Sequence, residues 1–448
     1  MALKALDIFK LLPKTNCKKC GCPTCLAFAM KLAQKQASLD QCPDVTAEAK
    51  AQLEGSAAPP IRLVTIGTGA KKLEIGNETV MFRHEEAFYH PPGIGVIVPD
   101  NLSDAELAAR IEAVGKLQFV RVGAHIQSDI VAVANVSSQA DPFAKTVAAV
   151  QKLDLPMVLI SKEPAHIDKA LESCKDKQPL ICGASADNWE KFAAIAKEKK
   201  CPLAVSGADL DAIAALTDKI KAAGVEDMIL DLTGAGIAET LQSLSAARQL
   251  ALKKNVRSLG YPSMTICGGG QSAGEQVAEC CTYVAKYAGI VLTELYTPEA
   301  ILPLLTLRQN LFTDPRKPIQ AEAKLNAVGA VTAQSPLLIT TNFSLTYYTV
   351  EGEVETSRVP AFIAAIDTDG TSVLTAFASD KLTAEKVAAF LKSDAVKGKV
   401  AHKKVIIPGY VAVMSGALEE ESGGWQVLVG PREASAIPKY LKTVWKSE

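Results

Sequence analysis

The sequence predicts an α/β protein of three consecutive parts. Five of the eleven cysteines fall within the first 42 residues, which marks a small separate segment. After it, short apolar runs alternate with amphipathic segments, a pattern typical of parallel strands that helices cover on both faces. The last part repeats this alternation with small polar loops. We expect the three parts at residues 1–57, 93–325 and 326–448, with a linker and a β-hairpin arm at residues 58–92 between the first two.

The composition indicates a soluble protein with well-filled cores. The chain has 448 residues, 48% of them hydrophobic, and a formal net charge of −1, so neither nucleic acid nor a membrane surface is indicated as a partner. No apolar run approaches membrane-spanning length. The first residues carry an acid and lack the apolar core of a signal peptide. The many thiols, together with the lack of a visible signal peptide, predict that the protein works in a reducing and anaerobic cytoplasm.

The first part offers thiolates at the spacing Cys17-x2-Cys20-x4-Cys25-x16-Cys42. A [4Fe–4S] cluster is held by four such thiolates, and we predict these four cysteines as its ligands. A zinc site is the second interpretation, because zinc also takes cysteine pairs but usually from two separated knuckles. A disulfide pair is the third. Cys22 would be a fifth thiol, either a bystander or a ligand that exchanges with a neighbour.

Helices are expected on both sides of this loop. One covers Leu3–Leu12, and another begins at Cys25, where its N-terminus would favour the negative charge of a cluster. Gly21 and Pro23 make the loop compact. The run Gly55–Pro60 marks a linker. An arm of three short strands follows, with a turn at residues 75–79 between the last two: Ile61–Ile66, Lys72–Ile75 and Thr79–Phe82.

The middle part contains eight apolar strands whose starts recur every 23 to 36 residues. They are Ile94–Val98, Ile130–Ala134, Met157–Ile160, Leu180–Gly183, Leu203–Ser206, Met228–Leu232, Met264–Cys267 and Ile290–Thr293. Amphipathic helices separate most of them: Asp104–Val114, Pro142–Lys152, Ile167–Cys174, Trp189–Glu198, Leu210–Ala222, Ala238–Lys253 and Glu275–Tyr287. Eight units favour a (β/α)8 TIM barrel over a doubly wound open sheet. Strand-like residues at Phe119–Val122 must then lie in an insertion.

The last part predicts an open α/β sheet with a ligand site at the carboxyl ends of its strands. The strands are Leu337–Thr341, Phe362–Ile366, Val405–Ile407 and Gln426–Val429. Helices are expected from Asn342 onward and at Val373–Ala378, Ala384–Leu391 and Glu433–Leu441. No G-x-G-x-x-G or G-x-x-x-x-G-K-[ST] motif occurs here, so a nicotinamide or a nucleotide triphosphate is not indicated. Taken alone, the small polar loops are ordinary βα loops.

The chain resembles the large subunit of the corrinoid iron–sulfur protein, a family of methyl carriers in anaerobic acetyl-CoA synthesis. The resemblance runs over nearly the whole length. The residues that carry it are Asn16-Cys17-x-x-Cys20-Gly21-x-Pro23-Thr24-Cys25-Leu26-Ala27-Phe28-Ala29, Phe82-Arg83-His84, Phe88-Tyr89-His90, Leu305-x-x-Arg308-Gln309-Asn310-Leu311-x-Thr313-Asp314-Pro315, Thr340-Thr341-Asn342-Phe343-Ser344-Leu345-Thr346-Tyr347-Tyr348 and Gly430-Pro431-Arg432-Glu433-Ala434-Ser435.

This resemblance implies a cluster domain, a TIM barrel and a C-terminal corrinoid-binding domain of Rossmann or flavodoxin-like type. It also implies that Cys22 is not a ligand. The chain has no Asp-x-His-x-x-Gly motif, so a cobalamin-type corrinoid would be bound base-off, with no protein histidine on cobalt. His402 is then expected to be a solvated surface residue. We place the corrinoid against Thr340, Thr346, Gly370, Thr371, Ser372, Val373, Gly430, Pro431, Arg432, Glu433 and Ala434.

The implied function is methyl transfer in the reductive acetyl-CoA (Wood–Ljungdahl) pathway. A separate methyltransferase would pass the methyl group of methyltetrahydrofolate to Co(I), and acetyl-CoA synthase would receive it. The cluster would reactivate Co(II), with a reductive activator or ferredoxin as electron source. A small corrinoid protein subunit would complete a heterodimer. The competing class is a ferredoxin-like electron-transfer subunit without corrinoid, which would lack corrinoid absorption.

The barrel is expected to act as a scaffold. Its strand ends show no paired carboxylates with a base and no His–Cys arrangement, so we predict no catalytic residues and treat the chain as the carrier subunit of a methyltransferase system. Cys267, Cys280 and Cys281 lie in apolar strand or helix segments, where small buried thiols are common. We therefore do not assign them to a metal site.

Overall fold

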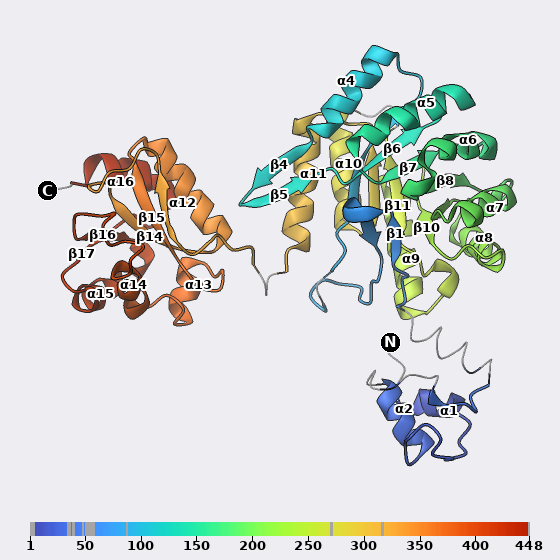
Figure 1. Ribbon diagram of the computed structural model, residues 1–448, viewed down its shortest axis with the longest axis horizontal. Coiled ribbons are helices and arrows are strands. Elements are labelled where there is room, and N and C mark those ends of the chain that lie inside the picture. Colours follow the sequence, from blue (N-terminus) through green and yellow to red (C-terminus); the bar gives the residue numbers. More distant parts are fainter. Residues whose placement is uncertain are drawn as a thin grey trace. The chain divides into compact units, whose positions relative to one another are not determined.

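The computed structural model describes residues 5–33, 37, 41–46, 49, 59–86, 88–268, 272–314 and 318–446 (Figure 1). The chain divides into two compact units. The first comprises Met1–Gln118 and Gln127–Phe312, and the second comprises Phe119–Ile126 and Thr313–Glu448. Among the described helices, none has the length and apolar character needed to cross a bilayer.

The first unit contains a closed barrel of eight parallel strands in the order β10-β11-β12-β3-β6-β7-β8-β9. The strands are β3 (Gly93–Pro99), β6 (Ile130–Ala134), β7 (Met157–Ile160), β8 (Leu180–Ala184), β9 (Leu203–Val205), β10 (Met228–Asp231), β11 (Ser263–Cys267) and β12 (Ile290–Thr293). All eight predicted strands are confirmed. The pairing of β12 with β3 closes the barrel and excludes the open-sheet alternative for this part.

Helices follow the barrel strands: α4 (Asp104–Gly115), α5 (Ala140–Val150), α6 (Pro164–Cys174), α7 (Trp189–Lys199), α8 (Leu210–Ala222), α9 (Ile237–Lys253), α10 (Ala273–Ala285) and α11 (Pro298–Phe312). Short 3₁₀ turns lie at η3 (Gln151–Leu153), η4 (Lys175–Lys177) and η5 (Arg257–Leu259). Capping boxes start two of the helices, with Ser103 and Glu106 at α4 and with Ser272 and Glu275 at α10. Helix α11 was not predicted, because Pro303 lies inside it and proline disfavours a helix interior.

A two-stranded hairpin packs into the barrel core at the amino-terminal ends of the strands. Strand β1 (Val64–Ile66) pairs antiparallel with β2 (Leu73–Ile75), and η2 (Gly69–Lys71) connects them. The side chains of Val64, Ile66 and Ile75 are buried in the same cluster as Ile130 and Ile290, which begin barrel strands. The hairpin therefore plugs this end of the barrel.

The predicted third strand of the arm is wrong. Thr79–Phe82 form no strand, and the connection of the hairpin lies between β1 and β2 rather than at residues 75–79. Gly76 has φ of +96°, and a Cβ there would lie 2.0 Å from the carbonyl oxygen of Arg62. This backbone contact leads the chain away from the hairpin, so it does not turn back into another strand.

The expected insertion at Phe119–Val122 is confirmed as a second hairpin, β4 (Gln118–Arg121) and β5 (Ala124–Gln127). Val122 and Gly123 both have positive φ, 45° and 76°, as a two-residue hairpin turn requires. Although the hairpin interrupts the barrel sequence, Phe119–Ile126 belong to the second unit. Gly123 lies against Tyr348 there, and an added Cβ would come within 2.6 Å of the tyrosine ring.

The second unit is an open sheet in the order β13-β15-β14-β16-β17. Its strands are β13 (Leu325–Val328), β14 (Leu337–Thr341), β15 (Ala361–Ile366), β16 (Lys404–Ile407) and β17 (Gln426–Val429). Only β13 is antiparallel, and it is the one strand here that was not predicted. The chain moves from β14 to β15 on one side and later to β16 on the other, so the connections diverge between β14 and β16.

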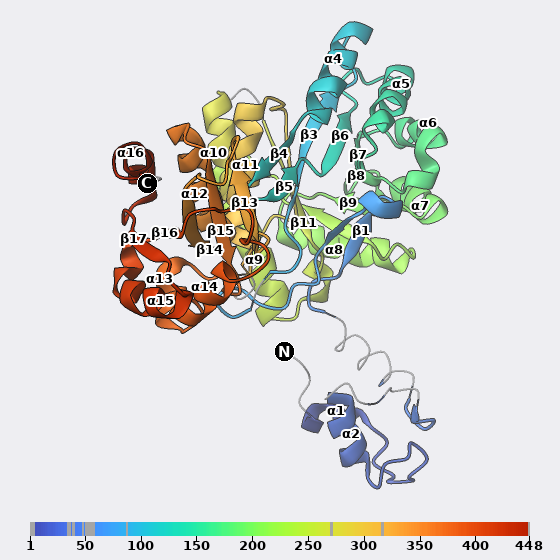
Figure 2. The ribbon, with the colours of Figure 1, turned by 60° about the vertical axis from the view of Figure 1, so that its left-hand side comes forward.

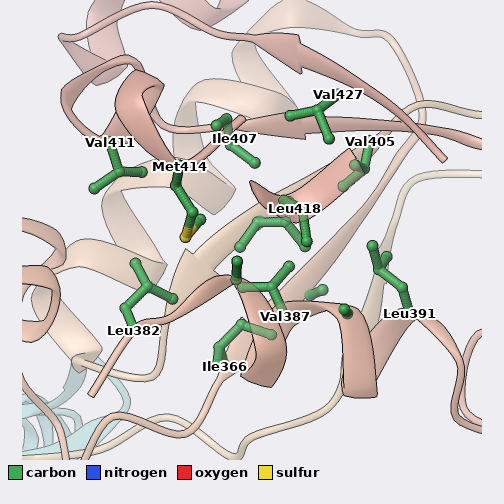
Figure 3. Close-up of a cluster of buried hydrophobic side chains, with 14 of the residues drawn as sticks. Ile366, Leu382, Val387, Leu391, Val405, Ile407, Val411, Met414, Leu418 and Val427 are labelled. Atoms are coloured by element: carbon green, nitrogen blue, oxygen red, sulfur yellow. The ribbon is translucent and has the colours of Figure 1, made fainter. Parts of the chain in front are cut away.

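Helices cover both faces of this sheet (Figure 2). They are α12 (Ser344–Ser357), α13 (Val373–Ala378), α14 (Ala384–Leu391), α15 (Ser415–Ser422) and α16 (Ile437–Thr443), with 3₁₀ turns η6 (Gly409–Met414) and η7 (Ala434–Ala436). On one face, α14 and α15 contribute Val387 and Leu418 to a core with Val405 and Ile407 (Figure 3). On the other face, α12 and α16 bury apolar side chains against the sheet.

The cysteine segment has two short helices, α1 (Ala5–Leu11) and α2 (Cys25–Ala33), which lie side by side. Ile8, Leu12 and Phe28 form a small apolar core between them, together with three of the cysteines. The two predicted helices are confirmed over the described residues. The linker from Gly55 to Ala58 lies outside the described residues.

Arg308 connects α11 to the start of the barrel. Its guanidinium donates to the carbonyl oxygens of Pro92 (3.0 Å) and Gln127 (3.1 Å) and forms an ion pair with Asp129. Asp129 in turn accepts from the backbone N–H of Ile94 at 3.2 Å. The arginine therefore joins the last helix of the barrel to its first two strands, which gives this motif residue a structural role.

We predict that Arg308→Ala lowers the free energy of unfolding by about 3 kcal/mol, because it leaves Asp129 without its partner in a site where the arginine side chain is only 11% exposed. Chemical denaturation of the variant measures this. The control is Lys116→Ala, which removes an ion pair with Glu112 whose side chains are 70% and 68% exposed and should cost less than about 0.5 kcal/mol. Equal effects of the two substitutions would contradict the assignment.

Candidate functional site

The loop before α2 is held in a compact shape by its own backbone. Asn16, Lys18 and Gly21 have positive φ, at 49°, 64° and 74°. The side-chain oxygen of Asn16 accepts from the backbone N–H of Cys25 at 2.8 Å, and the N–H of Asn16 donates to the Cys25 sulfur at 3.4 Å. Thr24 caps α2 by accepting from the N–H of Ala27 at 3.1 Å. The loop thus folds back onto the start of the helix.

The segment around Cys42 is attached to this loop by charge. Asp44 accepts from the thiol of Cys17 at 3.5 Å and pairs with Lys19 at 3.1 Å. The Lys19 ammonium and the Cys17 thiol lower the pKa of the Asp44 carboxyl, the lysine being the larger influence. These contacts bring the fourth predicted ligand toward the other three, although it is 17 residues beyond Cys25.

The Cys42 thiol is affected by its burial and by the other predicted ligands. Burial raises the pKa of the Cys42 thiol, and the nearby thiols of Cys20, Cys17 and Cys25 raise it further by charge repulsion. The positively charged core of an iron–sulfur cluster would relieve this repulsion, because the ligands of such a cluster are thiolates.

The same thiols do not form a site for a single ion. Within the part of the chain that the structure describes, no three Cys, His, Asp or Glu side chains lie close enough together to hold one metal ion. A [4Fe–4S] cluster distributes its thiolates over four irons, so its ligands need not converge on one point. Cys22 is buried in the small core of this segment at 4% exposure.

A hollow of about 270 Å³ lies at the carboxyl ends of the strands in the second unit. Eight of the predicted corrinoid residues line it: Thr340, Thr346, Ser372, Val373, Gly430, Pro431, Arg432 and Ala434. They come from the ends of β14 and β17 and from the starts of α12, α13 and η7. The walls are mainly apolar, as is usual for sites that bind organic cofactors.

Thr340 presents a hydroxyl that the protein itself does not use. Its side chain is 1% exposed, and its Oγ1 atom is buried without a hydrogen-bond partner among the described residues. A buried, unpaired hydroxyl is costly, which makes a bound ligand its natural partner. The neighbouring Thr341 has the same unpaired hydroxyl but does not line the hollow. The donor and acceptor capacity left at Thr340 fits a ligand rich in amide groups.

Three predicted residues do not line the hollow. Gly370 has φ of +68°, and an added Cβ would lie 2.7 Å from Gln320, so this glycine faces the chain rather than a ligand. The Thr371 hydroxyl donates to the carbonyl oxygen of Thr368 at 2.7 Å and stabilises the same turn. Glu433 points toward η6, where its carboxylate accepts from the Tyr410 hydroxyl at 2.5 Å.

Asn342 fixes the turn that carries Gly370, and the sequence analysis did not single it out. The side chain is 2% exposed. Its oxygen accepts from the backbone N–H groups of Thr368 (2.9 Å) and Gly370 (3.1 Å), and its nitrogen donates to Asp367 at 3.1 Å. An asparagine directly after a predicted buried strand could have indicated this role, because a buried side-chain amide must find hydrogen-bond partners.

The loops that follow β16 and β17 approach each other closely beside the hollow. A Cβ added to Gly409 would lie 2.6 Å from the carbonyl oxygen of Gly430, and the N–H of Gly409 donates to the carbonyl of Pro431 at 3.1 Å. Only glycine permits this backbone contact. Leu374 and Tyr410 also line the hollow while remaining 52% and 43% exposed, and sequence reasoning missed both.

The expectation that His402 is simply solvated is wrong. Its Nδ1 accepts from the backbone N–H of Lys404 at 3.2 Å, so its Nε2–H donates to the carbonyl of Ser335 at 2.8 Å. The ring also packs edge-on against Trp445, with centroids 5.1 Å apart. Both nitrogens are in use, and His402 does not line the hollow.

Polar groups at the mouth of the barrel satisfy one another. Asp100 is 4% exposed and accepts from Asn135 at 2.7 Å and from both the N–H and the hydroxyl of Ser137 at 2.7 Å. Elsewhere in the barrel, Cys280 hydrogen-bonds to Cys267, which together with burial raises the pKa of the Cys267 thiol.

Residues 63–441 match the family model described as CO dehydrogenase/acetyl-CoA synthase delta subunit, and residues 12–43 match one whose description proposes an Fe-S cluster. The corrinoid/iron–sulfur protein large subunit of Moorella thermoacetica is 45% identical over 443 residues, with 99% of each chain covered. The chain belongs to this large-subunit family. The acetyl-CoA decarbonylase/synthase complex subunit gamma of Methanothermobacter thermautotrophicus is 35% identical over 98% of this chain and 99% of its own length.

The two kinds of match differ in the subunit that they name. The family model that matches residues 63–441 is described as a delta subunit. The relatives that are similar over the full length are large and gamma subunits. We follow the full-length relatives, because their similarity also covers the cysteine segment. The gamma subunit of Methanopyrus kandleri agrees, at 33% identity over 98% of this chain and 97% of its own length.

We predict that replacing Cys17, Cys20, Cys25 or Cys42 by Ala removes the [4Fe–4S] signal, whereas Cys22→Ala retains it. The reason is the spacing of these four thiols, which supplies the four thiolates that a [4Fe–4S] cluster needs. Iron content and electron paramagnetic resonance of the reduced protein measure the outcome. Each ligand substitution should also be made in the Cys22→Ala background, since Cys22 can replace a lost neighbour. A full cluster in Cys42→Ala that lacks Cys22 would contradict the ligand set.

Proposed function

We propose that this chain is the corrinoid- and cluster-binding methyl carrier of acetyl-CoA synthesis. The observation that carries the proposal is the hollow in the second unit, with the unpaired Thr340 hydroxyl in its wall. It lies beside the point where the strand connections diverge, between β14 and β16, which is where doubly wound sheets bind ligands. We therefore propose that residues 326–448 are a flavodoxin-like corrinoid domain.

The size of the hollow indicates how a corrinoid would sit. About 270 Å³ is below the usual range for a drug-sized ligand, and a corrinoid is larger still. The hollow would therefore hold only part of such a cofactor, and the exposed side chains of Leu374 and Tyr410 at its rim would offer it further apolar surface.

Residues 1–57 would hold the [4Fe–4S] cluster through Cys17, Cys20, Cys25 and Cys42. When bound, the corrinoid supplies a cobalt centre that accepts and releases a methyl group, and the cluster supplies single electrons that return oxidised cobalt to its reactive state. The protein contributes binding and orientation. In the described part of the chain no histidine lines the hollow, so the residues there would offer no imidazole to cobalt.

The partners follow from this role. We propose that methyltetrahydrofolate donates its methyl group through a separate methyltransferase, and that acetyl-CoA synthase receives it. A small corrinoid protein subunit would cover the rim of the hollow, and a reductive activator or ferredoxin would provide electrons, all in the cytoplasm. The names of the relatives, which are subunits of acetyl-CoA decarbonylase/synthase complexes, support a carrier that works inside a larger assembly.

The hydroxyl of Thr340 gives a direct test. We predict that Thr340→Val leaves the free energy of unfolding unchanged or slightly higher, because it removes an unpaired buried hydroxyl, while it weakens corrinoid binding roughly 2- to 10-fold through one lost hydrogen bond. Corrinoid titration and denaturation of the same samples measure both effects.

Thr341→Val is the matched control for this test. It removes the same kind of unpaired hydroxyl from the next residue, which does not line the hollow. Its corrinoid affinity should equal that of the unmodified protein. If both valine variants bind corrinoid with unchanged affinity, Thr340 does not contact the cofactor.

We predict that His402→Ala loses stability, because it breaks two hydrogen bonds and the contact with Trp445, but leaves the cobalt spectrum unchanged. Electron paramagnetic resonance of the Co(II) state measures this. Both proteins should lack superhyperfine splitting from a protein nitrogen. A splitting that is present in the unmodified protein and absent in His402→Ala would show a histidine on cobalt and refute the base-off assignment.

A further inference from the structure

The cysteine segment carries a charge opposite in sign to that of the rest of the chain. Residues 1–57 contain eight lysines, three aspartates and two glutamates, a net charge of +3, whereas the whole chain has a formal net charge of −1. Residues 58–448 therefore carry a net charge of −4. The positive charge is thus a local property of the part that holds the cluster ligands.

Two of these lysines lie beside the ligand thiol that is nearest to solvent. Cys17 is exposed, whereas the other predicted ligands are half-buried or buried. Lys14 and Lys18 are exposed on the same loop, three residues before Cys17 and one residue after it. Within the described part of the chain, neither forms an ion pair, whereas Lys19 is paired with Asp44. The Lys14 ammonium lies 5.9 Å from the centre of the Phe9 ring, a contact that does not neutralise its charge, so the positive charges of both lysines remain available to a partner.

Apolar side chains are exposed on the helix that follows the loop of these lysines. Leu26 and Met30 are 38% and 53% exposed and lie four residues apart on α2, so they share one face of the helix. The hydrogen bond between Asn16 and the N–H of Cys25 places the start of α2 next to the loop that carries Cys17. An apolar centre with a charged edge is the usual composition of a protein interface, and electron-transfer encounters use small ones.

We propose that this face, the electron-entry surface of Lys14, Cys17, Lys18, Leu26 and Met30, binds a small electron-carrier protein with acidic residues around its own exposed redox centre. The inference rests on the proposed function, since the carrier would supply the electrons that the cluster passes on to cobalt. One electron moves from the reduced carrier to the cluster. The carrier is oxidised by one electron, the cluster is reduced by one, and no covalent bond changes.

A different role for the same lysines must be separated from docking. A cluster held by four thiolates is negatively charged, so nearby ammonium groups also favour its reduced form and raise its potential. Their loss would then slow reduction by every donor. A docking role instead predicts that the effect changes sign with the charge of the donor, because steering depends on the sign of both charges.

The experiment compares two electron donors on the holoprotein. The variant is Lys14→Glu/Lys18→Glu, and the control is Lys254→Glu, an exposed lysine of the barrel. The donors are a reduced, acidic [4Fe–4S] ferredoxin and the methyl viologen radical cation. Stopped-flow absorbance follows reduction of the cluster over a range of salt concentrations. Iron content, full reduction by dithionite and the midpoint potential are measured for each protein.

We expect the double variant to be reduced at least about 10-fold more slowly by the ferredoxin at low salt and faster by the viologen cation, with the difference disappearing at high salt. Met30→Ser should slow the ferredoxin reaction without changing its salt dependence. Equal rates with ferredoxin for the variant and the control would overturn the proposal. So would slower reduction by both donors together with a lower midpoint potential.

Cobalt takes no part in this measurement, so the outcome is independent of the corrinoid. If the cluster is reduced through the electron-entry surface but Co(II) is not reactivated, the electron-relay part of the proposed function fails while the docking surface stands. If the protein holds no cluster, the proposed function itself fails.

Discussion

Burial of parallel strands on both faces is the constraint on which this structure depends. Strands such as β3, β14 and β15 are buried along nearly their whole length, so each needs helices on both sides or closure into a barrel. Parallel strands also bring their carboxyl ends to one edge. The loops that follow them are thereby gathered together, and the hollow that Thr340 and Gly430 line is the result. In the barrel the same geometry gathers polar side chains that satisfy one another.

The two units use their strand ends differently because their polar side chains there have different partners. In the barrel, Asp100 accepts from Asn135 and Ser137, which leaves no unpaired group at that point. In the open sheet, Asn342 uses its amide to hold the turn after β15. Thr340, two residues earlier, is left with an unpaired hydroxyl in the wall of the hollow. One polar side chain thus fixes the loop while its neighbour remains available to a ligand.

The strands were predictable because their burial requires continuous apolar runs, which the sequence displays directly. The edge strand β13 was missed because its burial is partial and its sequence, Leu-Asn-Ala-Val, carries no such run. Most residues of the hollow could be predicted from their place after strands. Gly370 could not, because a glycine in a loop can serve either a ligand or a turn, and only the contact with Gln320 distinguishes the two. The engaged ring nitrogens of His402 depend on Ser335 and Lys404, and its packing on Trp445, contacts that no local pattern reveals.

The central claim is that one chain holds two cofactors at independent sites, a cluster on the cysteine loop and a corrinoid in the hollow of the second unit. Thr346→Trp tests it most directly, because Thr346 lines the hollow from the first turn of α12 and a tryptophan there would fill it. Iron and cobalt are counted in the same anaerobically purified sample. The account predicts that cobalt is lost while four irons per chain remain. Full cobalt occupancy in a folded variant would contradict it.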